Sequence, residues 1–206
     1  MKDGQQSPLR RASMGPDPFK QFARWLQDAE QAEILQPNAM TLATASRQGR
    51  PSARIVLLRG FDERGFAFFT NRESRKGRQL LENPFAALVF CWLPLSRQVR
   101  VEGSVEMLGD GESDAYFAGR PRGHQLEAHA SPQSQVIKDR RFLETQFEAA
   151  ARTFEGQAVP RPAHWGGYRL VPEALEFWQE GEHRLHDRLR YRRDPADRWV
   201  IERLAP

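Results

Sequence analysis

The chain opens with an apolar pattern at helical spacing. Asp17-Pro18 is typical of a helix start, because Asp suits the N-cap and Pro the first helical position. Apolar side chains then recur at helical intervals at Phe19, Phe22, Leu26 and Ala29, forming one stripe. This pattern predicts a first helix from residue 17 to about residue 33.

Short runs rich in β-branched and aromatic residues replace this pattern from Met40 onward. They predict strands at 41–45, 53–58, 66–70, 86–92 and 99–107, and, near the C-terminus, at 165–170, 175–179, 183–191 and 199–204. Turn-like segments, Gln48-Gly49 and residues 62–65 (Asp-Glu-Arg-Gly), separate the early runs, so these strands should pair antiparallel. A meander or Greek-key barrel would close such a sheet.

Three further helices are predicted between the strands. Ser74 caps the first, at 74–82, and Asn83-Pro84 ends it; the others cover 112–118 and 139–154. The predicted fold class is therefore mainly β with flanking helices, as one globular domain over residues 17–206. Residues 1–16 contain little that could offset the entropy of ordering, which predicts a flexible basic tail.

Charge narrows the possible partners to anionic ones. The 206 residues include 31 Lys and Arg, with a net charge of +4 and a pI near 9.6, which fits nucleic acid, a membrane surface or phosphorylated small molecules. Cys91, the single cysteine, excludes an intrachain disulfide and a cysteine-based metal cluster, and its place in an apolar run predicts a core residue. Without an apolar stretch of signal-peptide or membrane-spanning length, we expect a cytoplasmic protein.

One candidate constellation lies near the C-terminus. If residues 183–191 form a strand, Arg184, His186 and Arg188 share one face, where three cationic or protonatable groups repel one another. Such a face is tolerable in water or around an anionic ligand. An exposed, solvated edge strand is therefore the competing interpretation.

A phosphate site is a second candidate. Residues 54–59 (Arg-Ile-Val-Leu-Leu-Arg) form a predicted strand with arginine at each end, and Thr70-Asn71 leads to Ser74-Arg75-Lys76 at a helix start. A helix N-terminus presents unpaired N–H groups and the positive end of a dipole. Basic residues in a first turn oppose that dipole unless an anion binds there, so Arg54, Arg75 and Lys76 favour a bound phosphate.

The segments 176–179 (Glu-Phe-Trp-Gln) and 184–188 (Arg-Leu-His-Asp-Arg) resemble the C-terminal signature of the pyridoxine/pyridoxamine 5'-phosphate oxidases, and the resemblance extends over residues 17–206. It implies an FMN-binding split β-barrel, antiparallel and Greek-key, in a homodimer with FMN at the subunit interface. It also implies an oxidase that converts pyridoxine or pyridoxamine 5'-phosphate to pyridoxal 5'-phosphate with dioxygen, releasing hydrogen peroxide.

The resemblance also implies roles for individual residues. Those around FMN would be Arg54, Ile55, Val56, Leu57, Leu58, Arg59, Phe69, Thr70, Arg75, Lys76, Gln98, Gln133, Ser134, Trp178 and Arg188, several of them from the partner subunit. Those around the substrate would be Arg59, Tyr116, Arg120, His124 and Leu185, with Arg184 and His186 as the catalytic pair over the pyridine ring. Three positions depart from the family pattern: Arg59 replaces a lysine, His124 a serine and Phe69 a tyrosine.

Other functions remain open at this point. Within the same fold, the alternatives are a phenazine-biosynthesis-type flavin oxidase, which acts on larger carboxylated tricycles, and a non-catalytic protein that binds flavin or heme. Tyr116 and Arg120 favour a phosphate. An RNA-binding barrel would need Phe66, Phe68 and Trp92 as exposed stacking platforms, whereas their strand pattern is more typical of a core. We expect no nucleic acid or membrane partner, and the histidine spacing indicates no metal site.

Overall fold

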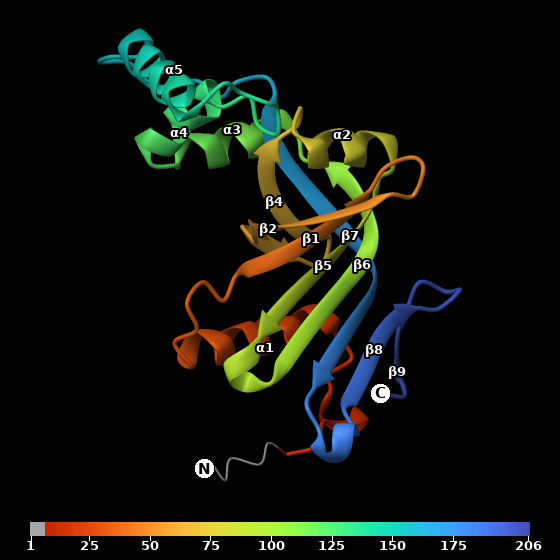
Figure 1. Cartoon of the computed structure of the whole chain (residues 1–206). Coiled ribbons are helices and arrows are strands. Elements are labelled where there is room, and N and C mark those ends of the chain that lie inside the picture. Colours follow the sequence, from red (N-terminus) through yellow and green to blue (C-terminus); the bar gives the residue numbers. More distant parts are fainter. Residues whose placement is uncertain (1–6) are drawn as a thin grey trace.

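The computed structural model describes residues 7–206, which form one antiparallel sheet of nine strands with helices at both ends (Figure 1). The strands are β1 (Ala39–Ala45), β2 (Pro51–Leu57), β3 (Gly60–Asp62), β4 (Gly65–Asn71), β5 (Phe85–Trp92), β6 (Arg97–Met107), β7 (Trp165–Gln179), β8 (Asp187–Arg193) and β9 (Trp199–Arg203). The main path runs β2-β1-β5-β6-β7-β4-β3, and β8 and β9 extend it from β7. The expected antiparallel, mainly β fold with flanking helices is confirmed.

The long strand β7 holds the two parts of the sheet together. Its first half pairs with β4 through Phe66↔Leu170, and its second half pairs with β8 through Phe177↔Leu189, while β6 runs along its other edge. The sequence predicted two strands here, 165–170 and 175–179, because Pro172 and Glu173 interrupt the apolar pattern. In the structure a single strand, β7, continues through Pro172 and Glu173. The pairing register with β6 shifts opposite Gly103, where Pro172 has no N–H to donate to the ladder.

The helices begin where the capping residues predict. α1 (Pro18–Gln31) starts with Asp17 accepting from the Phe19 and Lys20 N–H groups, and α2 (Arg75–Glu82) with Ser74 accepting from the Gly77 N–H. α3 (Asp110–Ala118) and α5 (Arg140–Thr153) also lie close to their predicted ranges. The sequence prediction lacked α4 (Arg122–Ala130), because an early glycine and two histidines leave it with only a weak apolar stripe.

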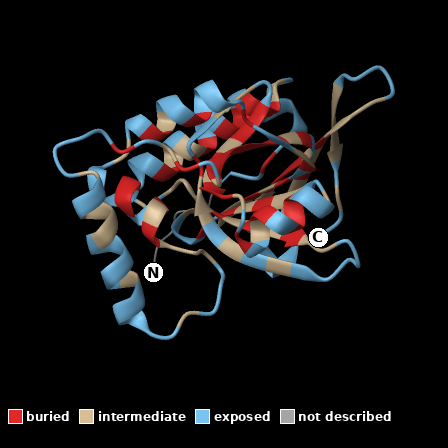
Figure 2. Cartoon of the chain, turned by 90° about the horizontal axis from the view of Figure 1, so that it is seen from above, coloured by how far each residue is buried: buried red, intermediate tan, exposed pale blue. Residues whose placement is uncertain are grey.

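The core lies between α1 and the concave face of the sheet, and Figure 2 shows the buried segments gathered at the centre of the molecule. Phe22 of α1 packs edge-on against Phe66 and Phe90, with ring centroids 5.0 and 4.8 Å apart. Phe66, Phe68 and Trp92 are all buried, which removes the stacking platforms that an RNA-binding barrel would need. Cys91 is exposed, contrary to the prediction of a core residue, because Phe90 and Trp92 on either side of it point inward.

The segment that leads into α1 packs against the far end of the sheet. Leu9 and Met14 are buried, and the Leu9 N–H donates to Asp187 Oδ2 over 2.8 Å. The Tyr191 hydroxyl donates to Gly15 O over 2.6 Å. The prediction of a flexible tail is therefore wrong for residues 7–16, because the burial of two apolar side chains and these hydrogen bonds offset the entropy lost on ordering. Residues 1–6 of the predicted tail lie outside the described part of the chain. No helix within residues 7–206 is long and apolar enough to cross a membrane.

Candidate active site

A group of polar side chains surrounds the N-terminus of α2. Lys76 Nζ donates to Gln133 Oε1 over 2.6 Å, to Thr70 Oγ1 over 2.9 Å and to Ser74 Oγ over 3.3 Å. β4 supplies Thr70 from its end, and the segment after α4 brings in Gln133 from a distant part of the sequence. The structure thus joins three segments around one ammonium group.

Arg54 of β2 approaches the same group from the neighbouring strands. Its Nη1 donates to Thr44 Oγ1 over 2.7 Å and to Leu42 O over 3.0 Å, and its Nη2 donates to Ser52 Oγ over 2.5 Å. A guanidinium carries five N–H groups, so two remain without a partner among residues 7–206. Arg54 can therefore offer donors to a further acceptor.

Burial and like charges make this cluster electrostatically unfavourable by itself. Burial, together with the nearby charge of Arg54, lowers the pKa of Lys76 to about 8. Burial and the charge of Arg75 also lower the pKa of Arg54. Within residues 7–206, no carboxylate forms an ion pair with Arg54, Arg75 or Lys76. A dianionic phosphate would supply the missing counter-charge.

A second cationic cluster lies between α3 and the end of β4. Phe69, Tyr116 and Trp165 form a parallel aromatic stack, with the Phe69 and Tyr116 centroids 3.9 Å apart. Arg59 lies 5.9 Å from the Tyr116 ring, and Arg120 lies 4.6 Å from the Trp165 ring.

Arg120 has an unsatisfied donor in this cluster. Its Nη1 is buried without a hydrogen-bond partner in the described chain. Burial lowers the pKa of Arg120, Glu127 and Tyr116 oppose this, and Arg59 lowers it further. An anion between Arg59, Tyr116 and Arg120 would satisfy the buried donor. His124 and Leu185, the other predicted substrate contacts, are exposed.

The segment that carries Arg184 and His186 precedes the strand β8. The prediction that this strand begins at residue 183 is therefore wrong. Residues Glu182–Arg184 form a short 3-10 turn, in which His183 and Arg184 have φ of 52° and 63°, and β8 begins at Asp187. Gly181, after β7, allows the chain to turn there, and its N–H donates to His186 Nδ1 over 3.2 Å. The common pleat face predicted for Arg184, His186 and Arg188 is therefore absent.

His186 is instead held beside Trp178, with the two rings 4.7 Å apart. Trp178 of β7 pairs in register with Gln98 of β6, so these two predicted cofactor contacts are neighbours. Arg184 is exposed. The turn therefore exposes the Arg184 guanidinium to solvent, while the His186 imidazole packs against the Trp178 indole.

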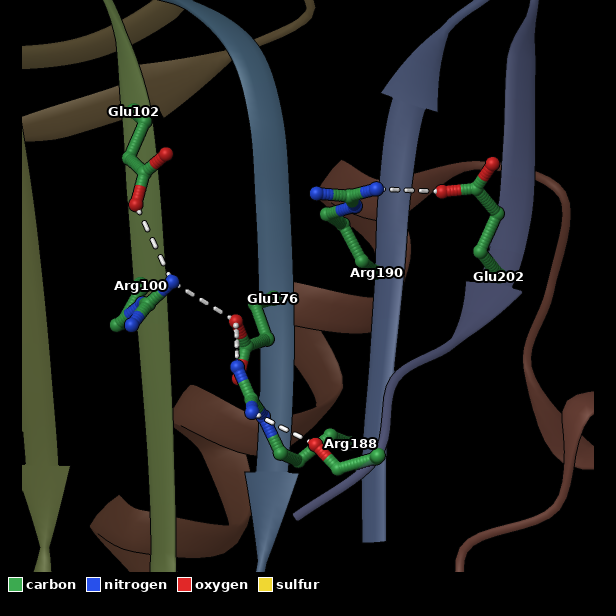
Figure 3. Close-up of polar contacts among 7 residues, drawn as sticks. Arg100, Glu102, Glu176, Arg188, Arg190 and Glu202 are labelled. Atoms are coloured by element: carbon green, nitrogen blue, oxygen red, sulfur yellow. Dashed lines mark hydrogen bonds and ion pairs between the residues drawn. The ribbon is translucent and has the colours of Figure 1, made fainter.

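Arg188 is fixed by a carboxylate that the sequence prediction did not single out. Its Nε and Nη2 donate to Glu176 over 2.8 and 3.1 Å, and Arg100 reaches the same carboxylate over 2.9 Å (Figure 3). Glu176 is 4% exposed although it lies on the outer side of the sheet, opposite the core-facing Phe177. Glu176 alternates with Phe177 along the strand, but only the pairing with β6 and β8 reveals its partners.

The predicted residues thus form two groups at opposite ends of the folded molecule. Near α2 and α3 lie Arg54, Arg59, Phe69, Thr70, Arg75, Lys76, Tyr116, Arg120 and Gln133. At the far end of β7 (Figure 1) lie Gln98, Trp178, Arg184, His186 and Arg188. A strand of 15 residues spans up to about 50 Å. Ile55 is 65% exposed, Val56 and Leu57 are half-buried, Leu58 is buried and Ser134 is exposed.

Comparisons with known proteins find matches over nearly the whole chain. A family model described as pyridoxamine 5'-phosphate oxidase matches residues 26–154, and one described as the pyridoxine 5'-phosphate oxidase C-terminal dimerisation region matches residues 165–206. A pyridoxine/pyridoxamine 5'-phosphate oxidase from Salinibacter ruber is 56% identical over 96% of this chain and 93% of its own length. One from Cyanothece sp. is 53% identical over 100% of this chain and 96% of its own length.

Solved structures show the same fold. PhzG from Burkholderia lata 383, in complex with tetrahydrophenazine-1-carboxylic acid, superposes with a TM-score of 0.90 at 36% identity, over 96% of this chain and 98% of that one. A pyridoxamine 5'-phosphate oxidase-related, FMN binding protein from Nostoc punctiforme has a TM-score of 0.74 at 20% identity, over 94% and 100% of the two chains. By its sequence, its matched family models and its split-barrel fold, this chain belongs to the pyridoxamine 5'-phosphate oxidase family.

Proposed function

We propose that this chain is an FMN-dependent oxidase that converts pyridoxine 5'-phosphate or pyridoxamine 5'-phosphate to pyridoxal 5'-phosphate. Dioxygen would be the electron acceptor and hydrogen peroxide a product. The observation that carries the proposal is the pair of cationic clusters, one around Lys76 and Arg54 and one around Arg120, because it matches two phosphate groups, one on the cofactor and one on the substrate.

The cluster around Lys76 fits the phosphate of FMN. Arg54 retains two N–H groups that no residue of the described chain accepts, Lys76 is desolvated among neutral hydrogen-bond partners, and the α2 N-terminus adds backbone donors beside Arg75. When bound, FMN supplies the two-electron acceptor that connects substrate oxidation to dioxygen. Gln133 and Thr70 would complete the hydrogen bonds at this end of the cofactor.

The cluster around Arg120 fits the substrate phosphate. Arg59, Tyr116 and the unsatisfied Arg120 Nη1 would bind it, and Arg184 and His186 would hold the pyridine ring. These contacts fix the reacting carbon in place, which is the main contribution that the protein makes when a cofactor carries the electrons. Oxidation of the alcohol removes two electrons and two protons, which dioxygen takes up as peroxide; the amine also consumes water and releases ammonia.

A homodimer would unite the two groups of residues. The far end of β7, with Trp178, His186 and Arg188, belongs to the region matched by the C-terminal dimerisation model. Because one chain holds this end far from Lys76, the complete site needs the turn of a partner subunit next to the α2 cluster. FMN and substrate would then lie at the interface of two chains.

A phenazine-type oxidase is the second candidate, because the fold of PhzG matches with a TM-score of 0.90. The two candidates differ in the substrate anion. The Arg59, Tyr116 and Arg120 cluster offers at least two guanidinium groups to one phosphate, more charge than a single carboxylate requires. This favours the phosphorylated substrate.

A steady-state assay tests the proposal. The purified protein, supplied with FMN, should form aldehyde and peroxide in equal amounts from pyridoxine 5'-phosphate, and much more slowly from pyridoxine without its phosphate. Turnover of a phenazine carboxylic acid precursor with none of the phosphorylated vitamers would contradict the proposal and support the second candidate.

A further inference from the structure

Gln79 is a buried polar side chain in the middle of α2, with 7% of its surface exposed. Its Oε1 accepts hydrogen bonds from Thr44 Oγ1 and from Ser52 Oγ, each over 2.6 Å. The two hydroxyl groups belong to neighbouring strands, β1 and β2, at a position where Thr44 and Ser52 pair in register. One carbonyl oxygen therefore binds both strands to the helix.

The direction of these hydrogen bonds determines whether the Thr44 and Ser52 hydroxyls can donate to further neighbours or only accept from them. A hydroxyl has one proton, so a hydroxyl that donates to Gln79 can only accept from its other neighbours. Arg54 is a further neighbour of both, since its Nη1 donates to Thr44 over 2.7 Å and its Nη2 donates to Ser52 over 2.5 Å. The two hydroxyl oxygens lie 3.5 Å apart, and neither can donate to the other while both donate to Gln79. Gln79 thus turns two hydroxyl groups into acceptors that orient the Arg54 guanidinium.

We infer that Gln79 is a positioning residue for the phosphate of the bound cofactor, which it never touches, acting through Thr44, Ser52 and Arg54. The inference rests on the proposed function, in which Arg54 binds that phosphate. A guanidinium held by both hydroxyls keeps its remaining N–H groups in one orientation, so phosphate binding need not order a mobile side chain. The same network joins Arg54 of β2 to the helix that carries Arg75 and Lys76.

The neutral charge of Gln79 is part of this role. A glutamate at position 79 has nearly the same shape and could accept the same two hydrogen bonds. It would also place a carboxylate next to the hydroxyls that hold Arg54, and that negative charge would compete with the phosphate for the guanidinium. A role in packing alone predicts no such competition for the guanidinium.

A double-mutant cycle on FMN affinity tests the inference. FMN is removed from the full-length protein, and the dissociation constant is measured by quenching of flavin fluorescence. We expect Gln79→Met to raise this constant about tenfold, the effect of losing one hydrogen bond to a charged group. In an Arg54→Met background the same change should have less than about a twofold effect, because its target is gone.

Three other variants separate positioning from packing. In a Lys76→Met background, Gln79→Met should keep its full effect, because no hydrogen bond links these side chains. Gln79→Glu should weaken FMN binding at least as much as Gln79→Met, and Gln79→Leu provides the same cycle if the methionine variant does not fold. Gln21→Met, which removes a buried glutamine from α1 at the other end of the sheet, should leave FMN affinity unchanged.

The outcomes distinguish a failure of the role of Gln79 from a failure of the proposed function. Equal effects of Gln79→Met with and without Arg54, or wild-type affinity in Gln79→Glu, would overturn the role of Gln79 while the proposed function stands. A wild-type protein that binds no FMN would overturn the proposed function itself. A loss that appears with Arg54 present and vanishes without it supports the inference.

Discussion

At the scale of single residues, Lys76 is the group whose titration should report on cofactor binding. Its pKa is lowered to about 8 in the flavin-free protein, and a bound phosphate would raise it again. Binding above pH 8 therefore requires proton uptake by Lys76. We expect FMN affinity to be nearly constant around pH 7 and to fall above pH 8, with a slope approaching about tenfold per pH unit.

The control for this prediction is Lys76→Met, which has no proton to take up. It should bind FMN more weakly at pH 7, and its affinity should change little between pH 7 and 9. The flavin-free protein should also become more stable as the pH rises from about 8 toward 10.5, because folded Lys76 has already lost its unfavourable charge in this range while unfolded Lys76 still carries it. Parallel pH curves for the wild type and Lys76→Met would refute the role of Lys76.

Residue-level patterns predicted some positions and missed others for clear reasons. Arg75 and Lys76 oppose the dipole of α2, a local conflict that the sequence alone reveals, and the structure places them beside Arg54. The sequence around Gln79 does not reveal its role, because its hydrogen-bond partners Thr44 and Ser52 lie on strands distant in sequence. Contacts of this kind depend on sheet register, which the sequence pattern does not specify.

At the scale of elements, capping residues were reliable and strand ends were not. Asp17 and Ser74 marked their helices because a cap acts within one turn of backbone. The pattern could not show that β7 continues past Pro172, or that β8 begins only at Asp187, since both depend on the partner strands. The predicted face of Arg184, His186 and Arg188 failed for this reason.

The bulge between β6 and β7 provides a test at this scale. A Cβ at Gly103 would lie 2.0 Å from the Val171 carbonyl oxygen, so the two strands would have to separate. We expect Gly103→Ala to lower the free energy of unfolding by about 1–3 kcal/mol, as for other overpacked sites. Urea denaturation at one fixed protein concentration measures this change.

Gly111 provides the matched control, because a Cβ there meets nothing within 4 Å and the residue lies in α3. Gly111→Ala should leave stability unchanged or raise it by up to about 1 kcal/mol, since alanine favours helix. Equal stabilities of Gly103→Ala and the wild type would show that the long strand β7 does not need its close approach to β6.

At the scale of the whole molecule, the separation of the two residue groups predicts complementation between subunits. Lys76→Met and Arg184→Ala should each inactivate the homodimer. A mixed dimer would have one site carrying both changes and one site carrying neither. Random mixing of the two chains should therefore restore about a quarter of wild-type activity. Turnover no higher than that of either variant alone would show that each subunit contains a complete site.

Anaerobic reduction of the bound flavin tests the proposed oxidase activity. The purified protein should be yellow, with the absorption of FMN, and this absorption should bleach when pyridoxine 5'-phosphate is added without oxygen. Admitting dioxygen should then restore the colour and yield peroxide. A colourless protein that takes up no FMN, or a flavin that pyridoxine 5'-phosphate and pyridoxamine 5'-phosphate both leave oxidised, would contradict the proposed function.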